Sequence, residues 1–107
     1  MILRTWKARA KPRNVDEYVR HFRELVVPEL TKLPGFLGAS VAQRPLGESA
    51  GADVEITVIS RWESLEAIHG FAGSDIGVAV VEPAAAAVLE SYDRHVEHLT
   101  TIYDVQP

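Results

Sequence analysis

The sequence predicts an α+β domain built on an antiparallel sheet. Strand-like alternation and helix-like periodicity follow one another in the order strand, helix, strand, strand, helix, strand. A loop of small and turn-forming residues separates the two middle strands, which therefore form a hairpin. At 107 residues the chain has the size of one compact domain. We therefore expect a single domain over residues 1–107.

The first strand is predicted over residues 2–10. Ile2, Trp6 and Ala8 fall on one face of this segment, and Thr5 falls on the other. Pro12 then ends the strand, because proline has no N–H group to give to a sheet ladder.

A long amphipathic helix follows. Asn14, with Glu17 three residues later, is typical of a capping-box helix start. Pro28 lies inside the helical pattern and predicts either a kink or a separate last turn, and Pro34-Gly35 predicts the end of the helix. The apolar residues that recur at helical spacing are Val15, Tyr18, Val19, Phe22, Leu25, Val26, Leu30 and Leu33.

The second half of the chain predicts two strands over residues 36–44 and 54–62, joined by a hairpin loop over residues 45–52. Ser64 can cap a second helix, which Gly73 ends. Residues 74–82 are ambiguous, since they are apolar but contain a glycine. A short helix is predicted over residues 83–90 and a last strand over residues 93–104.

This order is that of a ferredoxin-like β-α-β-β-α-β fold with a four-stranded antiparallel sheet. Helices cover only one face of such a sheet. The other face includes Leu3, Ile59, Leu99 and Tyr103, whichever side chains point outward. An apolar open face usually marks an association surface, so we expect a homodimer in which two sheets pack together.

Composition excludes several classes of function. A net charge of −4 and a pI near 5.5 argue against a nucleic-acid partner. The absence of cysteine excludes disulfides, thiolate catalysis and cysteine-ligated metals. No segment has the length of a membrane span, and the N-terminus does not resemble a signal peptide. We expect a cytoplasmic protein without a membrane partner.

Four sequence segments together point to a known family. They are Pro34-Gly35-Phe36-Leu37-Gly38, Arg61-Trp62-Glu63-Ser64-Leu65-Glu66-Ala67-Ile68, Phe71-Ala72-Gly73-Ser74-Asp75 and Asp93-Arg94-His95-Val96-Glu97-His98. In this order they resemble the antibiotic biosynthesis monooxygenase family, over nearly the whole chain. The resemblance implies a dimeric α+β barrel with a pocket inside each subunit, and either cofactor-independent oxygenation of phenols and quinols or haem degradation.

The haem-degrading branch of that family does not fit this sequence. The branch has an Asn on the first strand, and no Asn lies there. Its Trp and its haem-ligating His fall on Phe71 and Val81 of this chain. We therefore expect no haem cofactor.

Histidine is the residue whose ordinary pKa lies nearest neutrality, which makes it the natural base. His98 shares strand parity with apolar residues, and His69 borders the apolar stripe of the second helix. We name these two as candidate catalytic residues, although both can equally be structural. We place His21 on the polar side of the first helix and His95 on the open face of the sheet. On a strand, His95 and His98 point to opposite sides, so no metal site is predicted.

The aromatic side chains can form the walls of a pocket for a planar compound, or simply the core. The candidates are Trp62, Phe71, Trp6, Phe22 and Tyr92.

The resulting hypothesis is cofactor-free monooxygenation of a small phenol- or quinol-type compound. Two alternatives stay open. One is a ligand-binding or stress-associated dimer that performs no chemistry, and the other is an isomerase or decarboxylase on the same fold. No phosphate-binding loop, nucleophile elbow or paired catalytic carboxylates appear in the sequence.

Overall fold

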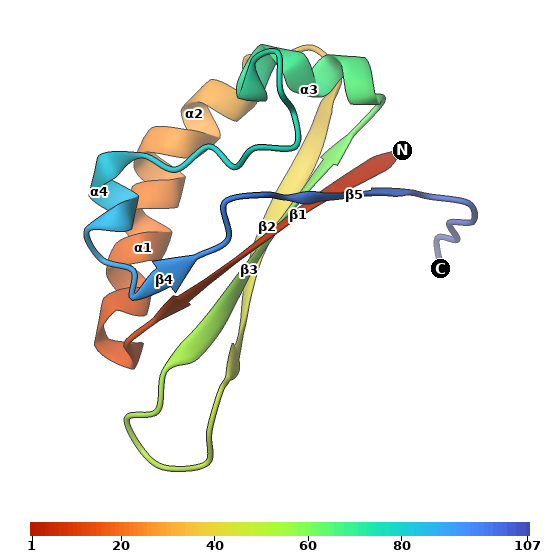
Figure 1. Ribbon diagram of the computed structural model, residues 1–107. Helices are drawn as coiled ribbons and strands as arrows, with labels where there is room; N and C mark the ends of the chain where they lie inside the picture. The colour runs from red at the N-terminus through yellow and green to blue at the C-terminus, as the bar shows by residue number, and fades with distance from the viewer.

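The computed structural model describes residues 1–107 and shows a single twisted sheet with helices against one of its faces (Figure 1). Strands β1 (Ile2–Ala10), β2 (Phe36–Pro45) and β3 (Val54–Trp62) form the centre of the sheet, in the order β2-β3-β1. The short strands β4 (Ser91–Tyr92) and β5 (Glu97–Thr100) both pair with the outer edge of β1. All pairs are antiparallel, which confirms the predicted α+β ferredoxin-like fold.

The first helical region is nearly continuous but changes its winding. It runs through α1 (Val15–His21), a π-helical turn over Phe22–Val26 and α2 (Val27–Leu30). The π turn lies directly before Pro28, whose ring would otherwise clash with the preceding turn of a regular helix. The structure thus shows a change of winding ahead of this proline, and the helix continues through it to Leu30.

The predicted capping box at Asn14 is wrong. The side chain of Asn14 makes no capping hydrogen bond. Instead, a 3₁₀ turn over Pro12–Asn14 leads into α1, and the backbone N of Asn14 donates to the carbonyl of Lys11 over 2.9 Å. Proline at the start of this turn has its φ already set for a helical conformation, so the helix needs no side-chain cap here.

The second helix, α3 (Leu65–Ala72), begins and ends where the sequence predicts. The Ser64 hydroxyl accepts a hydrogen bond from the backbone N of Ala67 over 3.2 Å. Gly73 ends the helix with a φ of 79°, a conformation that glycine adopts without strain.

The last strand differs from the prediction, which placed it over residues 93–104. It is broken into β4 and β5, and the pairing with β1 stops at Thr100. Four residues, 93–96, lie between the paired segments, whereas only Trp6 and Lys7 lie opposite them on β1. The two additional residues let this part of the chain leave the ladder and contact a different segment.

That segment is Ser74–Glu82, which we call the strap. It contains no helix or regular strand, but Val78 forms a bridge with His95. The backbone N of Ala79 donates to the carbonyl of Arg94 over 2.8 Å, and that of Val96 donates to Gly77 over 3.0 Å. The strap therefore forms hydrogen bonds with backbone N–H and carbonyl groups that the broken strand does not use in pairing with β1. The helix after it, α4 (Pro83–Ala86), is shorter than the predicted range of 83–90.

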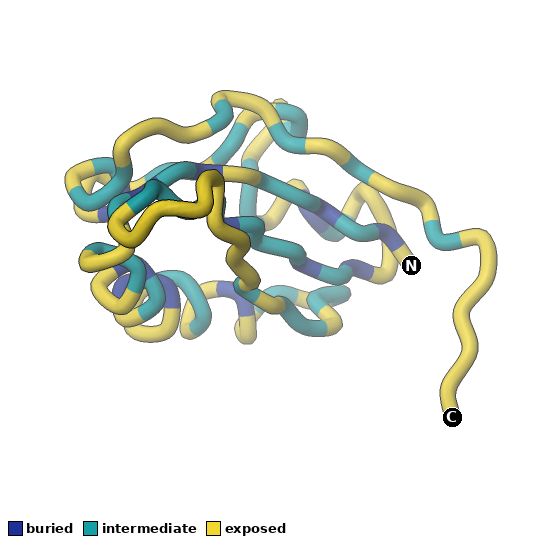
Figure 2. The backbone as a smooth tube through the Cα atoms, turned by 90° about the horizontal axis from the view of Figure 1, so that it is seen from below, coloured by how far each residue is buried: buried dark blue, intermediate teal, exposed yellow.

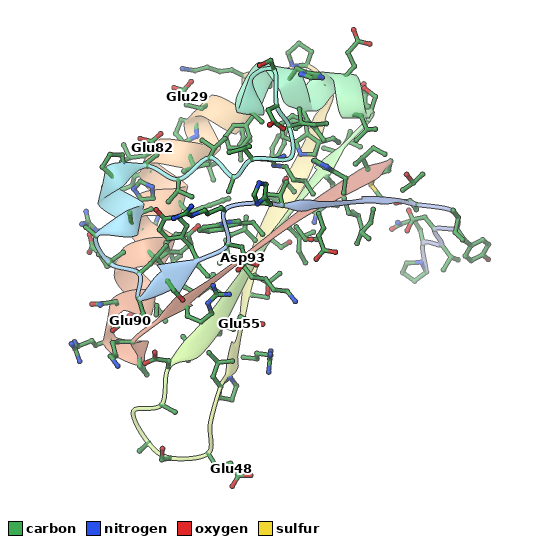
Figure 3. All side chains as sticks on the ribbon, in the orientation of Figure 1. Glu29, Glu48, Glu55, Glu82, Glu90 and Asp93 are labelled. Atoms are coloured by element: carbon green, nitrogen blue, oxygen red, sulfur yellow. The ribbon has the colours of Figure 1, made fainter.

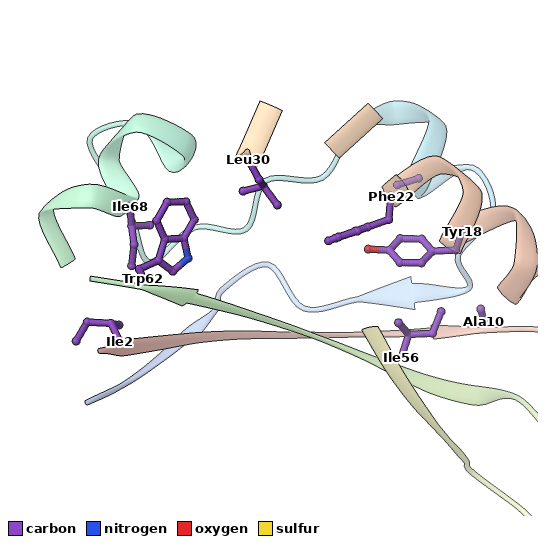
Figure 4. Close-up of a cluster of buried hydrophobic side chains, with 9 residues drawn as sticks. Ile2, Ala10, Tyr18, Phe22, Leu30, Ile56, Trp62 and Ile68 are labelled. Carbon is purple, nitrogen blue, oxygen red and sulfur yellow. The ribbon is translucent and has the colours of Figure 1, made fainter. Parts of the chain in front are cut away.

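The hydrophobic core lies between the sheet and the helices (Figure 4). The even-numbered residues of β1 face this layer, and Ile2, Ala8 and Ala10 are buried there. Figure 2 shows that buried positions concentrate in the sheet and on the inner sides of the helices, whereas the hairpin loop and the C-terminal segment are exposed. None of the helices is long and apolar enough to span a membrane.

Candidate functional site

A cavity of about 90 Å³ lies between the sheet and the helices. Its floor comes from β1 and β3, and its roof comes from the first helical region. Its remaining walls come from α3, the strap, α4 and Val96 between β4 and β5. Twelve of its seventeen lining residues are hydrophobic. One water molecule needs roughly 10–15 Å³ of such volume. The cavity can therefore hold several waters or one small ring.

Three of the predicted aromatic residues line this cavity: Trp6, Phe22 and Phe71. Trp6 is held in place because its indole N–H donates to the carbonyl of Asp93 over 2.7 Å. Phe22 is buried on the roof, where the π turn begins. The structure therefore brings residues from a strand and from two separate helical regions around one space.

Trp62 and Tyr92 are placed differently from the prediction, since neither lines the cavity. Trp62 is fully buried beneath α3, with its ring 5.3 Å from Phe36 and 6.2 Å from Phe71 between centroids. Tyr92 is 38% exposed on β4, with its ring centroid 6.2 Å from that of Trp6. Each of the two residues therefore packs against a cavity residue without lining the cavity itself.

The most unexpected residue of the cavity is Arg4. It lies on the inner face of β1 and is only 5% exposed. Its guanidinium donates to the carbonyls of Ile76 and Val78 in the strap. Burial lowers the pKa of Arg4 from its ordinary value, although an arginine still carries its charge near neutrality. Strand parity alone could have placed Arg4 on this face, since it shares the parity of Ile2 and Trp6.

His98 contacts Arg4 rather than the cavity itself. Its Nε2 lies 3.0 Å from Nη1 of Arg4. Arginine can only donate, so Nε2 is the acceptor and the ring proton sits on Nδ1. Burial, and next the charge of Arg4, lower the pKa of His98. The histidine is thus held neutral, but the nitrogen with the free electron pair is already occupied by the guanidinium.

His69 lies outside the site. It is exposed on α3, and its Nδ1 is 2.7 Å from the carbonyl of Gly73 at the end of the same helix. The prediction that it borders the pocket is wrong, because this local bond holds the ring at the helix terminus.

His21, predicted on the polar side of the helix, is in fact buried and lines the cavity. It is 8% exposed, and its Nδ1 has no hydrogen-bond partner. Its distance of three residues from Tyr18 and its position beside Phe22 put it on the apolar side of the helix. That spacing was the available signal, and the neighbouring Arg20 obscured it.

Tyr18 supplies a further polar group on the roof. It is 5% exposed and lines the cavity, and Figure 4 shows its hydroxyl pointing away from the helix toward the middle of the core cluster. Burial raises the pKa of Tyr18 above its ordinary value, so the hydroxyl keeps its proton and can donate a hydrogen bond.

Two carboxylates, Glu29 and Glu82, lie at the exposed rim of the cavity and on the same side of the molecule (Figure 3). Deeper in the cavity there is no carboxylate among the lining residues. The electrostatic pattern is thus a buried positive group with acidic residues at the solvent-facing edge.

The chain contains no group of three or more His, Cys, Asp or Glu side chains that could hold a metal ion. Phe71 and Val81, the positions that correspond to the Trp and the haem ligand of haem-degrading enzymes, both line the cavity. Neither can ligate iron.

The family model for antibiotic biosynthesis monooxygenases matches residues 1–83, from β1 to the start of α4. The chain belongs to this family. The fold is also that of a crystal structure from Bacillus cereus, described as a candidate antibiotic biosynthesis monooxygenase. The two chains share 21% sequence identity with a TM-score of 0.67, over 99% of this chain and 95% of the other. No curated protein matches the sequence.

Proposed function

We propose that this member of the antibiotic biosynthesis monooxygenase family oxygenates a small phenol- or quinol-type compound bound in the cavity. The observation that carries the proposal is the composition of the cavity wall. Four aromatic rings, including that of Tyr18, surround a mostly apolar space, and a few polar groups enter it from different elements. Such a site suits a planar ring with one or two oxygen substituents.

The reaction we propose takes its electrons from the substrate. A phenol and one O₂ give a quinone and water: a C–H bond of the ring breaks, a C–O bond forms, and the second oxygen atom leaves as water. The substrate loses four electrons and O₂ accepts them. Deprotonation of the hydroxyl makes the ring electron-rich enough to give the first electron to O₂, and a dry cavity favours the close approach of the two.

We assign the stabilisation of the phenolate and the removal of the phenol proton to different residues of the cavity. The charge of Arg4 stabilises the phenolate, and Tyr18 can donate a hydrogen bond to a developing oxyanion. His21 is the proposed acceptor of the phenol proton, since its ring lines the cavity. We assign His98 a positioning role, because its Nε2 accepts from Arg4 and so fixes the guanidinium.

The test is oxygen uptake by the full chain with a panel of phenols and quinols, measured with an oxygen electrode. We expect His21→Ala to lower kcat by roughly 100-fold or more, in the range of general-base removal. His69→Ala is the matched control, because His69 is an exposed helical histidine outside the cavity, and it should leave the rate unchanged.

Each alternative gives a different result in this assay. Saturable binding without oxygen uptake would indicate a ligand-binding protein. Product formation under nitrogen would indicate an isomerase or decarboxylase. Oxygen uptake that His21→Ala leaves unchanged would refute the assignment of His21 as the base.

We also propose that the protein is a homodimer formed through the open face of the sheet. Leu3 and Leu99 are paired neighbours, and Leu99 is 49% exposed. The adjoining C-terminal segment exposes Ile102 and Tyr103 even more strongly. A second copy would remove these side chains from water. Sedimentation should show a dimer at micromolar concentration, and Leu99→Asp should shift it toward monomer; a monomeric wild type would refute this.

A further inference from the structure

Arg4 is a buried cation without a carboxylate partner. Of the chain's other arginines, Arg9, Arg20 and Arg44 each form a salt bridge with an acidic side chain, whereas Arg4 forms none. Its partners are two backbone carbonyls and the neutral ring of His98. A buried charge is costly unless another charge compensates it. The protein itself does not provide that compensation at the cavity wall.

The hydrogen bonds of Arg4 also leave part of the guanidinium unused. A guanidinium has five N–H groups. Nη1 uses both of its hydrogens, on the carbonyl of Ile76 and on His98, and Nη2 uses one on the carbonyl of Val78. The Nε–H and one N–H of Nη2 remain.

Nε and Nη2 lie on one side of the guanidinium, the side that matches the two oxygens of a carboxylate. The same chain shows this arrangement on its surface, where Nε and Nη2 of Arg20 donate to the two carboxylate oxygens of Glu17. At Arg4 the neighbouring wall is aromatic, since its Cζ lies 6.0 Å from the centroid of the Phe71 ring.

A purely structural role, in which Arg4 only fastens the strap to the sheet, explains three of its hydrogen bonds. It does not explain the choice of a charged residue. Backbone carbonyls are neutral, so a neutral donor would serve them without the cost of burying an uncompensated charge. An anionic ligand group would accept from the unused N–H groups of Arg4 and would also compensate its charge.

We propose that Arg4 binds an anionic oxygen substituent on the aromatic ring of the ligand, either a carboxylate or an ionised hydroxyl. The inference rests on the proposed function and narrows its substrate class to aromatic acids and acidic phenols. The ring packs against Phe71 and Trp6, and the anionic group meets the Nε and Nη2 edge of Arg4.

The other ionisable groups of the cavity are compatible with such a ligand. The carboxylates of Glu29 and Glu82 repel an anionic ligand, but both are exposed at the rim of the cavity, where solvent screens their charge. His21 and Tyr18 are hydrogen-bonding groups on the roof and carry no negative charge that would oppose the ligand.

The experiment compares the binding of anionic and neutral ring compounds of similar size, by calorimetry under nitrogen. Benzoate is compared with benzamide, and 4-nitrophenolate with 4-nitroanisole, which separates a carboxylate from an ionised hydroxyl. The proteins are the wild type, Arg4→Met, Arg4→Lys and the control Arg9→Met. Arg9 lies on the same strand, but it faces the other side of the sheet and pairs with Asp93.

We expect the wild type and Arg9→Met to bind at least one anion roughly 10- to 100-fold more tightly than its neutral counterpart, the range of a charge-assisted hydrogen-bonded pair. Arg4→Met should lose this preference. Arg4→Lys should keep only part of it, because a lysine offers a point charge without the fork.

The proposal is overturned if the wild type binds neither anion, if it does not prefer an anion to its neutral counterpart, or if Arg4→Met keeps the preference. The wild-type comparison decides the question even if Arg4→Met fails to fold. Because binding is measured without oxygen, a failure of the proposed oxygenation would appear separately, as anion binding without oxygen uptake.

Discussion

Replacing Ser60 by alanine removes the acceptor of a buried hydrogen bond and tests how the cavity wall is supported. The indole N–H of Trp62 donates to the Ser60 hydroxyl over 2.9 Å. Trp62 is fully buried and Ser60 is 7% exposed at the cavity wall, so Ser60→Ala leaves the indole N–H without an acceptor from the protein. Trp62 in turn packs behind Phe71, which lines the cavity.

The expected cost is that of an unsatisfied buried donor, about 1–3 kcal/mol in the free energy of unfolding. Unfolding entropy is roughly 2.1 cal/mol/K per residue. For 107 residues this converts the cost into a fall in Tm of roughly 4–13 °C. Thermal and urea unfolding followed by circular dichroism, at one fixed protein concentration, measure both quantities.

A double-mutant cycle identifies the hydrogen bond as the cause. In a Trp62→Phe background the donor is gone, so Ser60→Ala should then cost less than about 0.5 kcal/mol. Ser40→Ala is the control, since Ser40 is an exposed serine that also accepts a hydrogen bond, from Arg61. An equal loss of stability from Ser60→Ala in both backgrounds would refute the reasoning.

Two further predictions concern pH and backbone strain. Burial and Arg4 lower the folded-state pKa of His98, so the unfolded chain takes up this proton more readily. Urea unfolding of the wild type should therefore lose more stability between about pH 7 and pH 5 than that of His98→Gln, and equal losses would contradict the assignment. Gly35 has a φ of 85°, and a Cβ there would lie 2.6 Å from that of Ala67. Gly51 has a similar φ of 87° with open space around it. Thermal unfolding should show Gly51→Ala costing about 1–2 kcal/mol and Gly35→Ala clearly more; equal costs would show that the contact with Ala67 is unimportant.

The polar groups of the site show where sequence reasoning fails. Arg4, His21 and Tyr18 line the same cavity. His21 and Tyr18 come from a helix and Arg4 from a strand, so no local sequence pattern groups the three residues. Arg4 and His21 depart from the general pattern in which charged and polar residues face solvent. Their side-chain periodicity in fact places both on the buried side.

The strap and the broken last strand show the same limit for the fold. Residues 74–82 carry no regular period, and their structure comes from contacts with Arg4, Arg94 and Val96 far along the chain. Residues 93–104 have strand-like alternation, yet only part of them pairs with β1. Local propensity cannot report a pairing partner that lies elsewhere in the sequence.

The sequence by itself determined the antiparallel α+β fold, the helix at Ser64 and Gly73, the irregularity at Pro28 and three of the aromatic walls. Each of these follows from periodicity, capping or proline geometry, which act over a few neighbouring residues. Only the tertiary structure decided that Trp62 is core, that His69 is outside, and that Arg4 of β1 meets His98 of the paired strand β5. Those outcomes depend on which surfaces pack together, because burial is a property of the assembled layers rather than of a residue's neighbours in the chain.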